Sequence, residues 1–262
     1  MNRRSQLSLL AWGALALHAI GVAPLAAESI AAPNRAEETA TRVIEALGGA
    51  ERFQSLNGLR WSFGTSVNDT VRSTRRHSWN KHSGWHKVDG VGRDGVHYAV
   101  AHVLGDSTQG WATLAMRSLQ GDSLRRAIQR GDALWTNDSY WFLMPYKLRD
   151  PGVRLADLGD TTLAGVVHRR FGMSFDGVGL TPGDRYTVVV NTATWRVTSW
   201  SFVLQGQQAS SEWTWEGWEQ HAGLWFPTIR RASEGSSRAG TVIFTNAVEA
   251  LREFPGGEFD AP

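Results

Sequence analysis

The spacing of apolar residues changes at about residue 58. Before it, apolar residues recur every three or four positions, which is typical of amphipathic helices, and we expect helices over 35–47 and 50–56. Asn34 is a suitable N-cap for the first helix, with Glu37 three residues later. From Leu59 onward apolar and polar residues alternate, which indicates strands with one buried face.

The alternating segments are short and are separated by brief turns rich in Gly, Asn and Asp, which favours antiparallel hairpins over parallel units. We therefore expect an α+β, mainly β fold. Its strongly curved antiparallel sheet of about ten strands would form an incomplete half-barrel, with helices packed on the concave side. The expected strands are 59–67, 71–81, 84–89, 96–104, 154–159, 165–175, 185–191, 196–205, 210–218, 224–233 and 240–248.

The middle of the chain interrupts this strand pattern. We expect a helix over 123–130, a break at Gly131-Asp132, and a second helix over 133–144. The second helix would end before Pro145, because proline has no amide proton with which to continue it. This helix is the most apolar stretch after residue 34, so it is the natural cover for an aromatic sheet.

The N-terminus has the features of a secretory signal peptide. Arg3 and Arg4 precede an apolar stretch over 7–25, and two small residues, Ala26 and Ala27, follow it. We predict cleavage after Ala27, giving a signal peptide over 1–27, a tether over 28–34 and one domain over 35–262. The alternative is a membrane anchor, but the unbroken apolar run is shorter than the roughly 20 residues that a spanning helix needs. The predicted location is therefore the periplasm.

Composition narrows the classes of function. Loss of residues 1–27 removes two of the 27 basic residues and no acidic residue, which leaves 25 basic and 25 acidic residues. This balance gives no basic footprint for nucleic acid, and we expect no stable membrane insertion after the signal is removed. The chain has no cysteine, so it has no disulfide and no thiolate nucleophile or ligand.

Thirteen tryptophans are an unusual number, and most lie in or beside expected strands. Trp213 and Trp215 fall on one face of their strand, as do Trp200 and Phe202 on theirs. Large exposed apolar patches are rare on soluble monomers, so this face must be covered, and a loose cover would leave an apolar cavity. The candidate cavity residues are Trp61, Phe63, Trp79, Trp135, Trp141, Phe142, Met144, Trp200, Phe202, Trp213 and Trp215.

Several turn and strand motifs resemble those of a known group of periplasmic proteins. They are Phe142–Pro145, Leu148–Gly152, Phe175–Gly179, Tyr186–Thr194 and Gly223–Ile229. Over residues 35–262 the chain resembles an uncharacterised bacterial family of the outer-membrane lipoprotein carrier-like group, which includes LolA, LolB and LppX. The resemblance implies a half-barrel with a helical lid, whose cavity receives acyl chains in the well-known carriers.

Residues that could support chemistry form no recognised catalytic motif. His77, His82, His86, His97 and His102 lie close in sequence. In an extended strand, His82 and His86 would be about 13 Å apart, too far for one metal ion. A turn at Ser83-Gly84 would bring them closer, and the sequence leaves both conformations open. Pairing of His77 or His86 with His97 across strands could still build a site. We predict no catalytic residue, no metal and no cofactor.

Paired arginines are the last feature. Within a strand, the two members of a pair such as Arg230-Arg231 face opposite sides. We expect them to be outer-face charges, with the alternative that one arginine of a pair faces the cavity and meets an acidic head group.

These features together favour a soluble periplasmic binder or carrier of a hydrophobic small molecule or acyl chain, with a further protein partner for cargo transfer. Two alternatives remain open. One is an aromatic-surface module that binds a protein or glycan, and the other is a hydrolase, in one version metal-dependent.

Overall fold

The computed structural model describes residues 34–176 and 183–262, all of which belong to one compact unit, Pro33–Pro262. The predicted signal peptide and nearly all of the tether lie outside the described residues, so both stay predictions. Within the described ranges, no helix combines the length and the apolar character that crossing a membrane requires.

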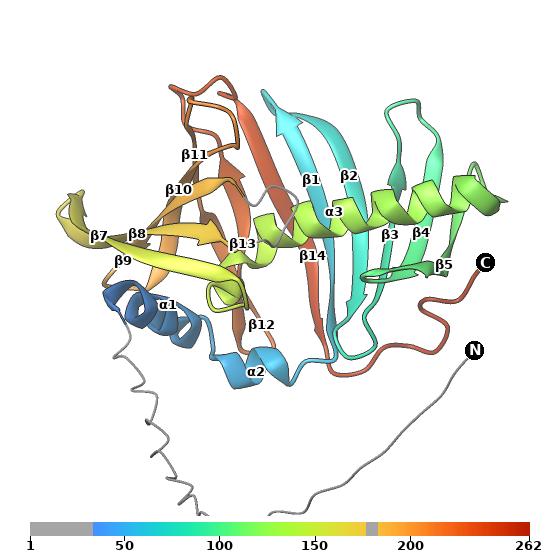
Figure 1. The fold of residues 1–262 in the computed structure, drawn as a ribbon, viewed down its shortest axis with the longest axis horizontal. Helices are drawn as coiled ribbons and strands as arrows, with labels where there is room; N and C mark the ends of the chain where they lie inside the picture. Colours follow the sequence, from blue (N-terminus) through green and yellow to red (C-terminus); the bar gives the residue numbers. More distant parts are fainter. Residues whose placement is uncertain (1–33, 177–182) are drawn as a thin grey trace, which may run out of the picture. The chain divides into compact units, whose positions relative to one another are not determined.

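The larger of two antiparallel sheets has nine strands, in the order β12-β13-β14-β1-β2-β3-β4-β5-β6 (Figure 1). Most neighbours in the sheet are also neighbours in sequence, as expected for hairpins. The strands are β1 (Gly58–Val67), β2 (Thr70–Asn80), β3 (Trp85–Val91), β4 (His97–Val103), β5 (Asp106–Leu114), β6 (Arg117–Ser118), β12 (Glu216–His221), β13 (Leu224–Arg231) and β14 (Thr241–Leu251).

The smaller sheet has five strands, in the order β11-β10-β9-β8-β7. The strands are β7 (Val153–Leu163), β8 (Val166–Phe175), β9 (Arg185–Asn191), β10 (Arg196–Val203) and β11 (Ser211–Thr214). The predicted fold class is confirmed, because the sheets are antiparallel and open and the helices are few. The prediction of one sheet with about ten strands is wrong in detail, since it missed β5 and β6 and did not separate the two sheets.

The two sheets meet where we expected one strand over 210–218. That strand is broken: β11 ends at Thr214 in the smaller sheet, and β12 begins at Glu216 in the larger one. Gly217 has a left-handed backbone (φ +63°), and its carbonyl accepts a hydrogen bond of 2.6 Å from Thr228 Oγ1. The break follows from this local conformation, which strand alternation in the sequence does not show.

A Gly217→Ala substitution is expected to lower the free energy of unfolding by about 1–3 kcal/mol, since the left-handed backbone disfavours a side chain and the new Cβ would clash. That Cβ would lie 2.2 Å from Thr228 Oγ1. Urea unfolding measures the effect. Gly235→Ala is the matched control, because no atom lies within 4 Å of its Cβ position. Equal stability of the two variants would contradict the role given to Gly217.

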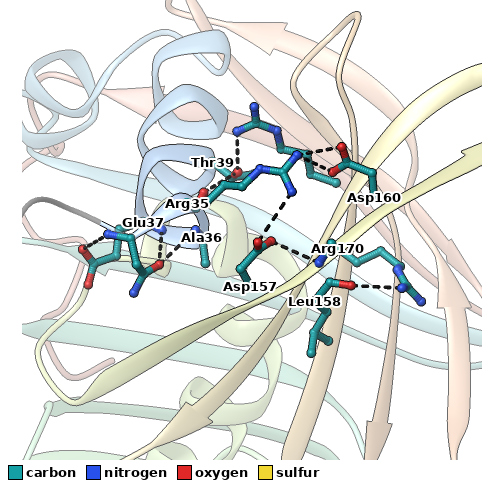
Figure 2. Close-up of polar contacts among 11 residues, drawn as sticks. Arg35, Ala36, Glu37, Thr39, Asp157, Leu158, Asp160 and Arg170 are labelled. Atoms are coloured by element: carbon teal, nitrogen blue, oxygen red, sulfur yellow. Dashed lines mark hydrogen bonds and ion pairs between the residues drawn. The ribbon is translucent and has the colours of Figure 1, made fainter.

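Helix α1 (Arg35–Ala46) begins with the predicted capping box, in which Asn34 and Glu37 bond each other's backbone amides. Arg35 fixes the start of α1 to β7 through hydrogen bonds of 2.6 and 2.7 Å to the Asp160 carboxylate, with Asp157 3.5 Å away (Figure 2). Thr39, one turn later, accepts a hydrogen bond of 3.1 Å from Arg169 of β8. α1 therefore packs on the smaller sheet, and the short helix α2 (Ala50–Gln54) leads into β1.

Helix α3 (Gly121–Lys147) is continuous, so the prediction of two helices separated at Gly131-Asp132 is wrong. Gly131 serves close packing and not a break, since a Cβ there would lie 2.9 Å from His102 Nε2 on β4. Pro145 lies inside the last turn, where its missing amide removes a single helical hydrogen bond. α3 contacts β3, β4 and β5 at one end and β13 at the other, and it lies across the larger sheet (Figure 1).

Two apolar clusters lie beneath α3. The small one contains Val88, Val100, Ala112 and Ile128, from β3, β4, β5 and α3. The large one is aromatic and joins α1, the C-terminal part of α3 and the inner faces of both sheets. The two clusters share helix α3 but no strand.

Candidate functional site

A cavity of about 520 Å³ opens between α3 and the smaller sheet. This volume lies within the roughly 300–1,000 Å³ typical of ligand sites. Its wall contains four charged residues, Lys147, Asp150, Asp184 and Arg238, and seven of its 17 lining residues are aromatic. The lining residues are Trp135, Thr136, Asn137, Ser139, Tyr140, Trp141, Lys147, Asp150, Pro151, Val153, Phe175, Asp184, Tyr186, Trp200, Phe202, Leu204 and Arg238.

The aromatic rings of the wall hold one another in place. Trp141 of α3 meets Trp200 of β10 edge-to-face, with ring centroids 4.7 Å apart. Trp141 makes a second edge-to-face contact, at 4.9 Å, with Trp213 of β11. Such aromatic pairs contribute about 0.5–1.5 kcal/mol each beyond their burial. Burial also raises the pKa of Tyr186, so the wall carries a neutral phenol.

The predicted cavity residues divide into two groups in the structure. Trp135, Trp141, Trp200 and Phe202 line the cavity. The other seven do not line it: Trp79 is partly buried and packs on the large core cluster, and the buried members of that cluster are Trp61, Phe63, Phe142, Met144, Trp213 and Trp215. A role in ligand binding stays a prediction for all of them.

Several lining residues were missed. Tyr186 begins the alternation of β9, with Val188 and Val190 on the same face, and this pattern is a signal that could have identified it. Phe175 and Tyr140 carry no comparable signal. Their rings meet each other at 5.6 Å only because β8 folds back beneath α3.

A chain of three buried histidines runs across β2, β3 and β4 under α3. His77 Nδ1 lies 3.0 Å from His86 Nε2, and His86 Nδ1 lies 3.1 Å from His102 Nε2. At one end, His77 Nε2 lies 2.9 Å from the Asp138 carboxylate; at the other, His102 Nδ1 lies 3.6 Å from Asp132. Both carboxylates belong to α3, so the chain joins one helix to three strands.

The carboxylate of Asp138 decides which histidine nitrogens carry protons. An ionised carboxylate only accepts hydrogen bonds, so His77 donates from Nε2 and a neutral His77 accepts at Nδ1. The same reasoning makes His86 and His102 donors through Nε2. His102 Nδ1 then points an unpartnered lone pair at Asp132. With all three imidazoles neutral, this proton arrangement satisfies the His77–Asp138 contact and both histidine–histidine contacts, but it gives no hydrogen bond to Asp132.

Burial is the main reason that these imidazoles are neutral. It lowers the pKa of His77 against the opposing effect of Asp138, and it lowers the pKa of His102. The pKa of His86 is lowered further, by burial and by its two histidine neighbours.

Asp138 remains a carboxylate despite its burial. Burial alone would raise its pKa, but hydrogen bonds from Arg75 and His77 outweigh that effect and lower it. Arg75 binds both carboxylate oxygens, at 2.7 Å through Nη2 and more closely through Nε. Asp138 thus fixes α3 to β2 through two side chains.

The histidine contacts differ from those expected. The structure joins His77, His86 and His102, whereas His82 and His97 are exposed. Within residues 34–176 and 183–262, no three His, Asp or Glu side chains are arranged to hold a metal ion.

Comparisons with known proteins are informative at the level of the fold. No family model and no curated protein sequence matches the chain. A solved structure of a LolA superfamily protein from Nitrosomonas europaea matches with a TM-score of 0.52 and 13% identity, over 85% of this chain and 97% of that one. A DUF1329 family protein from Desulfovibrio piger matches with a TM-score of 0.49 and 12% identity, over 86% and 97%.

A third solved structure is described as an outer membrane lipoprotein-sorting protein domain from Vibrio parahaemolyticus. It matches with a TM-score of 0.47 and 10% identity, over 85% of this chain and 95% of that one. The chain therefore has the LolA-like fold, which confirms the resemblance to the lipoprotein carrier-like group as a resemblance of fold.

Proposed function

We propose that this protein is a soluble periplasmic carrier that binds the apolar chain of a lipid or lipoprotein in the cavity between α3 and the smaller sheet. The observation that supports this proposal is the cavity itself, with a volume of about 520 Å³ and seven aromatic side chains in its wall. Apolar clefts of this size with a few polar groups at their edge are typical small-molecule sites. The LolA-like fold is consistent with the same role.

Helix α3 would act as the lid. Its residues 135–141 supply one wall of the cavity, and aromatic contacts connect them to β10 and β11. Release of a ligand would then require these contacts to separate while the Asp138 attachment holds the helix to β2. A protein partner that receives the ligand is part of the same proposal.

The proposal is tested by filling the cavity. Val153 lines it, and a Val153→Trp substitution is expected to weaken binding of a fluorescent fatty acid at least about tenfold, because the indole takes the space of the acyl chain. Val167→Trp is the matched control, since Val167 is exposed on β8 and lies outside the cavity lining. Equal binding by both variants would contradict a ligand site in this cavity, and so would absence of binding by the unmodified protein.

The aromatic-surface alternative has less support. None of the tryptophans in the described ranges is exposed; each is buried or half-buried. Glycan binding through exposed indoles would require several of them on the surface, and acrylamide quenching of the free protein measures this directly.

A further inference from the structure

Arg230 is a buried cation with unused hydrogen-bond donors. Its side chain is fully buried, whereas its neighbour Arg231 is exposed. Nη1 donates to the Pro227 carbonyl at 2.9 Å and to Thr245 Oγ1 at 3.2 Å. Its Nε and Nη2 find no acceptor among the residues that the structure describes. The pair therefore faces opposite sides, with one arginine directed into the core.

Two tryptophans near Arg230, Trp215 and Trp200, also have hydrogen-bond donors without an acceptor in the described part of the chain. The guanidinium lies 5.6 Å from the ring centroid of Trp215, and that ring lies 5.3 Å from the ring of Trp200. Trp200 lines the cavity, whereas Trp215 and Arg230 lie behind it, outside the lining. The indole nitrogens of both tryptophans are buried. An indole N–H and a guanidinium only donate hydrogen bonds. These three neighbouring side chains thus offer four N–H-bearing nitrogens and no acceptor.

Among the residues that the structure describes, no carboxylate forms an ion pair with Arg230. Asp138 is the acid that acts on Arg230 through space, but Arg75 and His77 already bind it. Burial lowers the pKa of Arg230 to about 9, so the guanidinium is still charged at neutral pH. A buried charge without a partner is costly, and an oxyanion that accepts several hydrogen bonds removes the cost.

We propose, building on the proposed function, that Arg230 with the indole N–H groups of Trp215 and Trp200 binds the anionic head group of the ligand. The ligand class is an amphiphile with a carboxylate or a phosphate monoester on a single apolar chain. The apolar chain occupies the cavity, and the head group lies at the part of the wall formed by Trp200, where it reaches Trp215 and Arg230 behind that ring. A guanidinium suits both oxyanions because its planar donors match their oxygen pairs.

The test compares palmitate, hexadecyl phosphate and hexadecanol, which share one chain and differ in the head group. Competition with a fluorescent probe gives the three dissociation constants. The unmodified protein is expected to bind palmitate, hexadecyl phosphate or both about 10- to 100-fold more tightly than hexadecanol, as charge-assisted hydrogen bonds allow. The stronger of the two anions identifies the head group as a carboxylate or a phosphate.

Arg230→Met is expected to remove this selectivity and leave hexadecanol binding within about twofold of the unmodified protein. Arg231→Met is the matched control, since it removes a cation from the exposed side of the same strand and should keep the selectivity. Arg230→Lys keeps the charge and should retain part of the preference. Replacement of a buried charge by an apolar residue of similar volume is commonly tolerated, and circular dichroism verifies folding.

Two results would overturn this assignment and leave the carrier function intact. One is equal binding of all three compounds by the unmodified protein. The other is selectivity that survives in Arg230→Met but is lost in Arg238→Met, which would place the head group at Arg238 instead. Failure of all three compounds to bind would instead reject the proposed function itself.

Discussion

An Asp138→Ala substitution is expected to lower the free energy of unfolding by about 3–5 kcal/mol, because it removes one partner of a buried ion pair and leaves the other behind. The Asp138 carboxylate is fully buried and binds Arg75 and His77. Without it, Arg75 loses its only ion-pair partner in the described residues, and the histidine chain loses the acceptor that orders its protons. Urea unfolding monitored by circular dichroism measures the loss.

Asp132→Ala provides the control for this substitution on the same helix. Asp132 lies at the other end of the histidine chain, its side chain is 43% exposed, and it is 3.6 Å from His102. Its removal should lower the free energy of unfolding by less than about 1 kcal/mol, as is usual for exposed charges. If the two variants were equally stable, α3 would not depend on the buried carboxylate.

Acidification from pH 7.5 to pH 5 is expected to lower the free energy of unfolding. His77, His86 and His102 have lowered pKa values in the folded protein, whereas an unfolded histidine titrates at about 6.5. Below that pH the unfolded chain therefore binds more protons than the folded one. The stability that depends on these three neutral histidines is fully present above pH 6.5 and is lost progressively as the pH falls below it. Asp138 contributes to the pH dependence of the free energy of unfolding only near and below pH 4, because its pKa is lowered in the folded protein.

Substitutions of His102, at the end of the histidine chain, and of two surface histidines separate this effect from general acid sensitivity. His102→Gln should reduce the pH dependence, because it removes one of the three buried imidazoles whose pKa is lowered in the folded protein. His82→Gln and His97→Gln should leave it unchanged, since both side chains are exposed. A pH dependence that survives loss of His102 but disappears with His82 or His97 would contradict the assignment.

Local patterns in the sequence predicted the elements well. The helix over 35–47, its capping box and most strands follow from spacing alone, and Trp213 and Trp215 do share the buried face that alternation gave them. These features depend on residues within a few positions of one another. The resemblance to the carrier-like group then supplied the arrangement of the sheet, which no local pattern contains.

Features that depend on distant partners could not be predicted. Gly131 has the composition of a helix breaker, but its role is contact with His102, 29 positions away. The histidine chain depends on strand register, which pairs His86 with His102 directly and places His77 diagonal to His86. A register is fixed by turns and by the buried face of the whole sheet, so five histidines within one segment gave no means of choosing the three that meet.

The sequence predicted only some of the residues that line the cavity, for the same reason. Trp135, Trp141, Trp200 and Phe202 were among the expected lining residues because the chain is most aromatic there, whereas Phe175 and Tyr186 come from strands whose neighbours were unknown. The expectation that the paired arginines are outer-face charges is wrong for Arg230, which is fully buried. Strand alternation required one arginine of the pair to face inward, but the sequence did not show that the inward residue would be buried beside Trp215.

The uneven support beneath α3 has a kinetic consequence. Its first turns rest on the four-residue aliphatic cluster, whereas its later turns are held by Asp138 and the aromatic core. Segments with few buried contacts open locally at a lower free-energy cost than the rest of a domain. Transient fraying would thus start at Gly121 and admit water to His102 first, so that exchange of the buried imidazole protons with solvent proceeds inward from that residue, strand by strand, and reaches His77 last.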